Sequence, residues 1–364
     1  MQQSFCIKNS YRCIVVRASP KILNTVKLAL ALGLLLAALL WRSRRNYHAL
    51  AELPLGISRQ VDCMVVIPAR NEEGNIGAAV RSLPPDSVIV VDDFSTDKTA
   101  EEARAAGAGV LPAPQSIAGA VGKSSACMEG ARVLTSRWIL FADADTRFDP
   151  RFVESAVAAA EGRKVDFLSV YLRPEYRTLW ESALSPYGIA LYFCGINPKR
   201  DPASAFNGQC VLVNRSAYEF IGGHKAVLDD VCEDVKMAAL AKRHRMKLAV
   251  MRAPRLGRVH IRPADFARNG RRFAEVSSRR GMYVAFAAAV WALWLPMLLV
   301  LFARHQFAIA VAWALLPSVF LSPWYGWRRA ILAPVGIYAI LPSLLRGALG
   351  AAMGRHFEWK GRVI

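Results

Sequence analysis

Two aspartates, Asp143 and Asp145, follow an apolar run and stand one residue apart in the segment LFADADTRF (140–148). A buried carboxylate is unfavourable unless a cation or hydrogen bonds compensate its charge, or unless the group changes its pKa. The pair therefore indicates a bound cation, a hydrogen-bonded loop or exposure to water. Because carboxylate oxygens suit magnesium and manganese, the pair is a candidate ligand set for a divalent ion that a diphosphate also holds.

Two further apolar runs also end in polar or charged side chains. The first leads into PARNEE (68–73), and the second ends at Asp92 and Asp93. Apolar runs and helix-like segments alternate in the order 63–69, 74–82, 87–93, 124–134 and 137–143. This alternation predicts a parallel sheet that is covered on both faces. Because ligands bind at the carboxyl ends of the strands in such sheets, we expect the three polar ends to form one site.

A second pair of carboxylates, Glu233 and Asp234, opens a predicted amphipathic helix. Carboxylates at a helix N-terminus can simply interact with the helix dipole, or one of them can act as a general base if a hydroxyl substrate reaches it. Ser95 and Thr99 leave a similar choice open, because they can cap the following helix or belong to a binding loop.

The composition favours a membrane protein of about two structural units over a cytosolic enzyme, because 54% of the 364 residues are hydrophobic while the net charge is +19. Residues 22–41 form a predicted transmembrane anchor. A cleaved signal peptide is the alternative, which the arginines at 42–45 and the lack of a cleavage pattern disfavour. Residues 282–302 carry no charge and are long enough to cross a bilayer. Weaker apolar segments follow at 307–324 and 330–345, of which the last contains two prolines and a glycine and is a candidate re-entrant helix.

Positive charge is concentrated beside the apolar segments, at 42–45 and 252–280. Such flanks are usually cytoplasmic and lie against anionic headgroups. We expect no nucleic-acid binding, because no recognition module accompanies the arginines. The seven cysteines are scattered without a Cys-x-x-Cys pair, which predicts neither a disulfide framework nor a zinc site and fits a reducing compartment.

The order of the motifs IPARNEE, VVDDFSTD, GKSSACMEGA, FADADT, FNGQCVLVNRSAYEFIGGH and ED resembles the inverting glycosyltransferases of family 2 over most of residues 62–245. The apolar C-terminal segments and the tail EWKGR (358–362) are similar to the membrane-bound branch that glycosylates lipids, which includes hopanoid-associated, carotenoid and ceramide glycosyltransferases.

The resemblance implies an α/β fold of the GT-A nucleotide-diphospho-sugar transferase type, with a Rossmann-like, mostly parallel sheet, an N-terminal transmembrane anchor and C-terminal transmembrane helices. The expected parts are a tail (1–21), the anchor (22–41), the GT-A domain (58–262), an arginine-rich interfacial segment (263–281), two to three transmembrane or re-entrant helices (282–353) and a second tail (354–364).

The resemblance also assigns the donor site. The uridine and ribose of a nucleotide sugar would be held by Pro68, Ala69, Arg70, Glu72 and Asp93. Lys123 would sit near the donor, and Asp143 and Asp145 would bind the donor and a divalent cation, Mg²⁺ or Mn²⁺.

On the acceptor side, the resemblance makes Asp234 the base that deprotonates the acceptor hydroxyl, supported by Glu233. Asn207, Gly208 and Gln209 would line the acceptor or sugar pocket. A metal and one carboxylate can stabilise the leaving diphosphate and activate the hydroxyl without a covalent enzyme intermediate. A single displacement would then give a β-linked product from an α-linked donor.

The expected function is metal-dependent, inverting transfer of a hexose from a UDP-sugar to a hydroxyl of a membrane lipid of the hopanoid, carotenoid or sphingolipid kind. The expected location is the cell (inner) membrane, multi-pass, with a cytoplasmic catalytic domain. The alternatives are a polyprenyl-phosphate sugar synthase and a non-catalytic membrane scaffold.

Processive members of the family carry an Arg-Trp pair shortly before the membrane, and RNGRRFAEVSSRRGMY (268–283) has no Trp after any arginine. This departure argues against polymer synthesis. The arginines of this segment either bind donor diphosphate or acceptor phosphate, or hold an interfacial helix against anionic lipid; they are Arg271, Arg272, Arg279 and Arg280.

Overall fold

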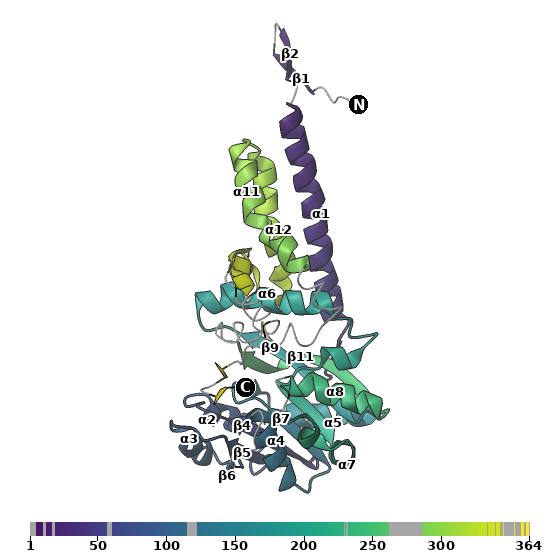
Figure 1. Ribbon diagram of the computed structural model, residues 1–364, viewed down its shortest axis with the longest axis vertical. Coiled ribbons are helices and arrows are strands. Elements are labelled where there is room, and N and C mark those ends of the chain that lie inside the picture. The colour runs from purple at the N-terminus through teal and green to yellow at the C-terminus, as the bar shows by residue number, and fades with distance from the viewer. Residues whose placement is uncertain are drawn as a thin grey trace.

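The structure, a computed structural model, has a sheet domain below and a group of apolar helices above, with helix α6 (Leu179–Gly195) lying crosswise between them (Figure 1). It describes residues 5–9, 12–16, 19–56, 60–114, 122–228, 230, 232–261, 286–332, 334–338, 340–342, 345, 353, 358–359 and 362–363. The arginine-rich segment expected at 263–281 lies outside these ranges.

Within the described residues the main sheet has nine strands. Eight of them are hydrogen-bonded to one another in the order β3-β11-β9-β10-β7-β4-β5-β6, and the ninth, β8, pairs with β11. The strands are β3 (Ala51–Glu52), β4 (Cys63–Ala69), β5 (Val88–Asp92), β6 (Gly109–Pro112), β7 (Trp138–Ala142), β8 (Thr146–Phe148), β9 (Phe167–Glu175), β10 (Cys210–Asn214) and β11 (Leu248–His260). Two small hairpins lie outside this sheet, β1 (Phe5–Asn9) with β2 (Arg12–Val16) and β12 (Glu358–Trp359) with β13 (Arg362–Val363).

Helices cover both faces of the sheet, as the continuous apolar strands predict. Successive side chains of β4 point to opposite faces, so that Val65 and Ile67 join one core cluster and Val66 joins the other. The first cluster includes residues of α2 (Ile76–Arg81), α3 (Thr99–Ala105) and α5 (Phe152–Arg163). The second includes residues of α4 (Gly122–Arg132), η1 (Pro202–Ala205), α7 (Arg215–Phe220) and α8 (Glu233–Arg243). A further 3-10 turn, η2, spans Gly223–Val227.

Two strands of the sheet depart from the parallel order: the short strand β8 is antiparallel to β11, and β10 runs antiparallel to both of its neighbours, β7 and β9. The first residue of β10, Cys210, therefore pairs with Ala142, the last residue of β7. The Asp143 amide donates to the Gln209 carbonyl at 3.1 Å, directly beyond this pair. The turn before β10 thus reaches the edge of the sheet where β4, β5 and β7 end, and the sheet is mixed but mostly parallel.

The apolar helices are α1 (Pro20–His48), α11 (Trp294–Ala303), α12 (Phe307–Tyr325) and α13 (Trp327–Ala330). In the described part of the chain, two helical stretches are long and apolar enough to cross a membrane, Pro20–His48 and Phe286–Ala303. Among the described residues, only 11% of the most apolar window of the first stretch is fully buried within the protein.

Helix α6 is fixed to the base of α1 through its own last carbonyls. The last four carbonyls of a helix have no partner within the helix. Asn46 of α1 donates to the carbonyls of Phe193 at 2.8 Å and Ile196 at 2.5 Å. Arg42 Nε donates to the Cys194 carbonyl at 2.9 Å, and the Ser43 hydroxyl donates to Ala190. Side chains of the apolar helix therefore complete the C-terminus of α6.

This contact gives the first prediction. Asn46→Ala leaves two buried carbonyls without a donor, which costs about 1–3 kcal/mol. Asn46→Asp, which replaces the donor by an acceptor of the same shape, is expected to cost at least as much. Both variants should melt below the parent when the full chain in detergent is followed by near-UV circular dichroism. Arg44→Ala, an exposed change on the same helix, is the control and should melt with the parent. An Asn46→Asp protein as stable as the parent would contradict the assignment.

Candidate active site

The carboxyl ends of β4, β5 and β7 bring together the residues that the sequence places at the donor site. Ala69 and Asp92 are register partners at the ends of β4 and β5. Arg70 donates to the Asp93 carbonyl at 3.0 Å and lies 3.8 Å from its carboxylate, which is almost fully buried. Arg70 thus provides the positive charge that a buried carboxylate needs.

The loops after β4 and β5 are joined by hydrogen bonds that run from backbone amides to side chains. The Asn71 amide donates to Ser95 Oγ at 3.0 Å, and the Glu72 amide donates to Thr99 Oγ1 at 2.8 Å. Ser95 and Thr99 therefore hold the neighbouring loop in place. Asp97 accepts from the Glu73 amide in the same way. Burial acts to raise the pKa of Asp97, but hydrogen bonds from Thr99 and from backbone amides outweigh it and lower this pKa.

Phe94, between Asp93 and Ser95, has a φ of +54° and a side chain that is 43% exposed. A bulky residue in this left-handed region is an outlier, because the conformation favours glycine. Such conformations persist where the surroundings determine them, often at binding sites. The hydrogen bonds between the two loops supply that constraint here.

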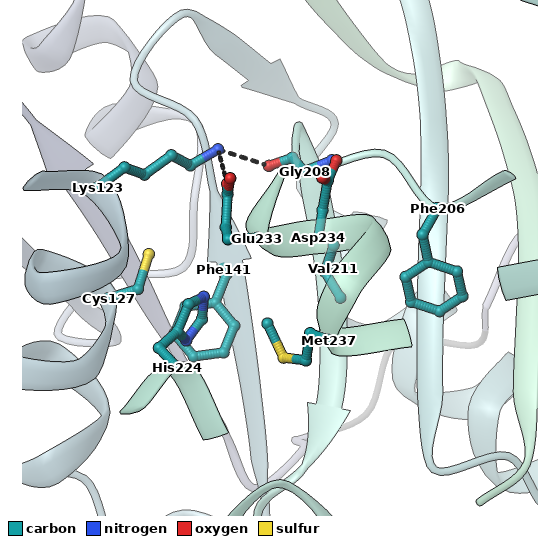
Figure 2. A pocket seen from close by; sticks show the side chains of 10 residues that line it. All are labelled: Lys123, Cys127, Phe141, Phe206, Gly208, Val211, His224, Glu233, Asp234 and Met237. Carbon is teal, nitrogen blue, oxygen red and sulfur yellow. Dashed lines mark hydrogen bonds and ion pairs between the residues drawn. The ribbon is translucent and has the colours of Figure 1, made fainter. Parts of the chain in front are cut away.

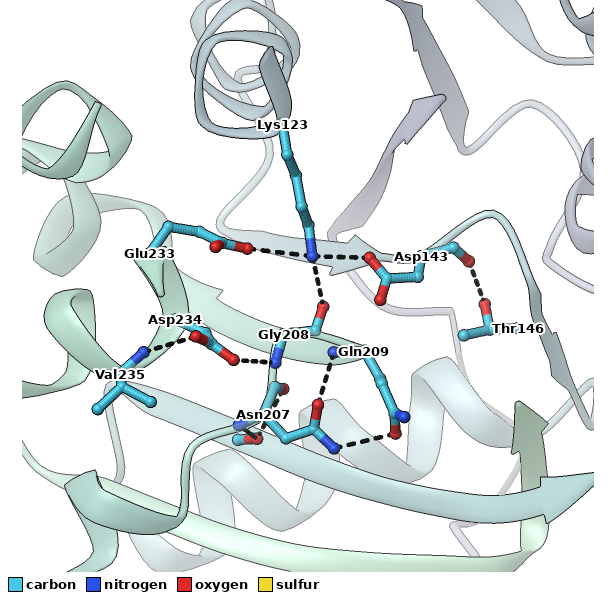
Figure 3. Close-up of polar contacts among 10 residues, drawn as sticks. Lys123, Asp143, Thr146, Asn207, Gly208, Gln209, Glu233, Asp234 and Val235 are labelled. Carbon is cyan, nitrogen blue, oxygen red and sulfur yellow. Dashed lines mark hydrogen bonds and ion pairs between the residues drawn. The ribbon is translucent and has the colours of Figure 1, made fainter. Parts of the chain in front are cut away.

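Lys123, near the start of α4, connects the ends of two distant elements (Figure 3). Its Nζ lies 2.8 Å from Asp143 Oδ1 and 3.1 Å from Glu233 Oε1, and it donates to the Gly208 carbonyl at 3.3 Å. Burial acts to lower the pKa of Lys123, but Asp143 and Glu233 outweigh it and hold this pKa well above its ordinary value. Lys123 is therefore a cation, and it balances Glu233, whose side chain is only 3% exposed.

Asp234 contacts the same turn before β10 that Lys123 contacts, but through the backbone amide of Gly208. Its Oδ2 accepts from the Gly208 amide at 2.6 Å, and its Oδ1 accepts from the Val235 amide at 2.9 Å. The two carboxylates that open α8 thus have different partners, because Glu233 pairs with a lysine and Asp234 with backbone amides.

The turn Asn207–Gln209 is held from several sides. Asn207 exchanges hydrogen bonds with Ser169 of β9 and with its own neighbour Gln209. A Cβ at Gly208 would lie 3.1 Å from Lys123 Nζ and 3.2 Å from Asp234 Oδ2. A side chain at this position would thus displace the charged ends of Lys123 and Asp234 by a few tenths of an ångström.

A small pocket opens beside this cluster, and its floor is apolar (Figure 2). It is lined by Lys123, Cys127, Phe141, Phe206, Gly208, Val211, His224, Glu233, Asp234 and Met237. Sequence reasoning missed the floor. His224 stands in the quoted motif FIGGH, and the structure places it 2.9 Å from the Tyr218 hydroxyl. Burial lowers the pKa of His224 to about 4, so it is neutral at physiological pH. Burial likewise raises the pKa of Cys127, which makes this thiol unreactive.

Asp143 and Asp145 both lie at the end of β7, and the Asp145 carbonyl accepts from the His260 amide. The described residues contain no group of three or more His, Cys, Asp or Glu side chains that could hold a metal alone. Two carboxylates fit an ion such as Mg²⁺, which commonly takes one or two protein carboxylates and fills its other positions with substrate phosphates and water.

The structure brings together the donor-side and acceptor-side residues that the resemblance assigned, in two groups, whereas Arg271, Arg272, Arg279 and Arg280 lie outside the described residues. Arg70, Glu72 and Asp93 belong to the joined loops, together with Pro68 and Ala69 at the end of β4. Lys123 links Asp143 to the acceptor-side group, which consists of Asn207, Gly208, Gln209, Glu233 and Asp234. The roles of these residues stay predictions.

Comparisons with known proteins give the site a context. Residues 64–222 match the model of glycosyl transferase family 2. Two relatives carry the name 4,4'-diaponeurosporenoate glycosyltransferase. The protein from Staphylococcus aureus (strain USA300) is 32% identical over 182 residues, which is 46% of this chain and 48% of the relative. The protein from Staphylococcus haemolyticus (strain JCSC1435) is 29% identical over 204 residues, which is 49% of this chain and 51% of the relative. The chain thus spans about half the length of these relatives.

Among solved structures, a mannosyltransferase from Pyrobaculum calidifontis in complex with GDP-Man and Mn²⁺ is similar, with a TM-score of 0.50. It is 16% identical, and the match covers 89% of this chain and 97% of that chain. This likeness concerns the fold alone, and it confirms the GT-A type expected from the sequence. With the motifs, the sheet order and the family match in agreement, residues 64–222 form a domain of glycosyl transferase family 2.

Proposed function

We propose that the chain is a membrane-attached glycosyltransferase. It would transfer a sugar from a nucleotide-diphosphate sugar, namely a UDP-sugar, to a hydroxyl group of a lipid. The observation that carries this proposal is the position of Lys123. It lies between Asp143, at the donor end of the sheet, and the Gly208 turn, which Asp234 holds. A donor-side carboxylate and a candidate base are thus connected through one cation and the turn that it contacts.

On the donor side, Arg70 and Asp93 together with the joined loops would hold the nucleoside, with Pro68, Ala69 and Glu72 alongside. Asp143 and Asp145 would hold a divalent ion, which supplies positive charge to the departing diphosphate. Lys123 adds its own charge beside Asp143, and 17% of its side chain remains exposed to an incoming ligand. An incoming phosphate would be stabilised by this ammonium in the largely buried site.

On the acceptor side, Asp234 would act as the general base. The proton of the acceptor hydroxyl passes to its carboxylate as the hydroxyl oxygen bonds to the anomeric carbon. The bond from that carbon to the diphosphate oxygen breaks on the opposite side, so the anomeric centre is inverted. Glu233 is engaged by Lys123 at 3.1 Å and would keep this cation in place. Its support of Asp234 would therefore be indirect.

A lipid acceptor is supported by the two apolar stretches Pro20–His48 and Phe286–Ala303, and by the names of the staphylococcal relatives, which suggest a carotenoid-like acceptor. Arg42, Arg44 and Arg45 at the end of α1 favour a cytoplasmic catalytic domain at the inner membrane, in a multi-pass arrangement. The arginines that would support the polyprenyl-phosphate alternative lie outside the described residues.

The direct test is transfer of radiolabel from UDP-sugars to membranes. We expect label in the organic extract in the presence of Mg²⁺ or Mn²⁺, and loss of this label with EDTA. Label found only in water-soluble products would overturn the proposal. Label that mild acid releases would instead favour a polyprenyl-phosphate product, since such a phosphodiester-linked sugar is acid-labile.

Replacement of the base gives a sharper prediction. Asp234→Asn keeps the shape of the side chain but removes its basicity, so kcat should fall by about 10²–10⁴-fold, which is the usual contribution of general base catalysis. The KM for the donor should change little, because Asp234 faces the acceptor turn. Asp86→Asn, on an exposed turn where φ is +55°, is the matched control and should behave as the parent. An active Asp234→Asn enzyme would require a different base.

Lys123→Met tests the central cation. It leaves the buried Glu233 without a counter-charge, and breaking a buried pair in this way costs about 3–5 kcal/mol. The double variant Lys123→Met/Glu233→Gln removes the charge that is left without a partner, and it should recover part of the melting temperature without recovering turnover.

Because the pKa of Lys123 is raised in the folded protein, its contribution to stability is complete below the ordinary lysine pKa. This contribution is lost only as the pH rises through the raised value. The parent should therefore show no loss of stability from Lys123 at neutral pH. A double variant no more stable than Lys123→Met would contradict this account.

A further inference from the structure

Helix α6 presents two large apolar side chains to the outside at its N-terminal end. Leu179 is 72% exposed and Trp180 is 70% exposed. Polar bonds nonetheless define the helix start, because Thr178 and Glu181 form a capping box and His260 Nε2 lies 3.0 Å from Glu181 Oε1. The apolar pair is therefore held in place by a well-defined helix end.

Both ends of α6 are attached to apolar helices. Its C-terminal end is capped by Arg42 and Asn46 of α1. Close to its N-terminal end, the guanidinium of Arg329 in α13 lies over the ring of Tyr176 at 5.9 Å. The direction of α6 relative to α1 is thus fixed, and α6 lies across α1 (Figure 1). If α1 crosses a bilayer, α6 lies along the plane of that bilayer.

Three exposed tryptophans lie on α6 and on the two helices that contact it, one on each element. Trp41 of α1 is 55% exposed, Trp180 of α6 is 70% exposed and Trp327 of α13 is 62% exposed. Each lies within three residues of an arginine, namely Arg42, Arg177 or Arg328. Tryptophan collects at the level of the lipid headgroups, and arginine binds anionic phosphate groups at the same level. Each of the three connected elements therefore carries one such pair.

We propose that α6 is an in-plane membrane helix. Its partner is the surface of a bilayer that contains anionic phospholipid. Leu179 and Trp180 lie at the boundary between headgroups and acyl chains, and Arg177 faces the lipid phosphates. This inference rests on the membrane attachment proposed above and adds to it the level at which the bilayer meets the protein.

The position of α6 has a consequence for the acceptor turn. Tyr192 of α6 donates to the carbonyls of Ser204 at 3.2 Å and Phe206 at 3.3 Å, directly before Asn207. The helix that lies on the bilayer therefore also supports the turn that Asp234 holds. The acceptor side of the pocket is set at a fixed height relative to the lipid headgroups.

Nitroxide labels at single cysteines test this placement without any need for turnover. Leu34→Cys, Trp180→Cys and Phe220→Cys are made in a chain whose Cys6 and Cys13 are replaced by serine, since the other five cysteines are buried. Leu34 is 73% exposed in the middle of α1, and Phe220 is a 67% exposed aromatic residue on α7 of the sheet domain. The full chain is placed in nanodiscs of phosphatidylcholine and phosphatidylglycerol. Collision rates with lipid-soluble O₂ and water-soluble Ni-EDDA are then measured.

We expect the ratio of O₂ to Ni-EDDA collisions to be highest at position 34, several-fold lower at 180, and lowest at 220. A label at Leu179→Cys should give the same collision ratio as the label at position 180. This second variant keeps the test valid if Trp180→Cys folds poorly. If labels at positions 179 and 180 gave the same collision ratio as the label at 220, while the ratio at position 34 was that of lipid, the in-plane placement would be overturned and membrane attachment would stand. A label at 34 that also matches 220 would overturn both.

Discussion

The ammonium of Lys123 is the interaction on which the site depends. It comes from α4, and its partners come from the end of β7, the turn before β10 and the start of α8. A nearly buried Glu233 would be costly without it, so these four segments must meet for the charge to be balanced. Buried ion pairs contribute little to net stability compared with apolar packing. The contacts of Lys123 are therefore better explained by their geometry, because they fix the distance between the end of β7 and the turn before β10.

The strand direction explains why the site has two halves. Its donor half comes from parallel strands whose ends carry loops joined by hydrogen bonds within residues 68 to 102. Its acceptor half comes from β10, the antiparallel strand, and from the turn that precedes it. Since α6 leads into that turn, the acceptor half is connected through α6 to the apolar helix α1. Under the proposed function, this connection would place the acceptor half of the pocket next to the lipid.

Much of this arrangement could be predicted from the sequence. The strand 63–69 was predicted with its observed limits, and the other two differ by one residue at each end, because long apolar runs bounded by charged residues leave little choice. The polar strand ends also meet as expected. The antiparallel direction of β10 could not be predicted, because pairing between distant strands has no local signal. The same holds for the left-handed backbone of Phe94 and for the contact of His224 with Tyr218, which depend on packing. The capping of α6 joins residues about 150 positions apart, although the Thr178 and Glu181 capping box is visible in TLWE.

The bonds from α1 to α6 mean that the apolar helix is more than a tether. A shortened chain that begins after His48 would lack the side chains that donate to four carbonyls at the C-terminal part of α6, so removal of α1 would alter the fold of the remaining chain. Attempts to obtain a water-soluble catalytic fragment should therefore start from a chain that keeps the last turns of α1. Structure determination with lipid or detergent around that helix would preserve the acceptor pocket, whereas a fragment without it would report a different one.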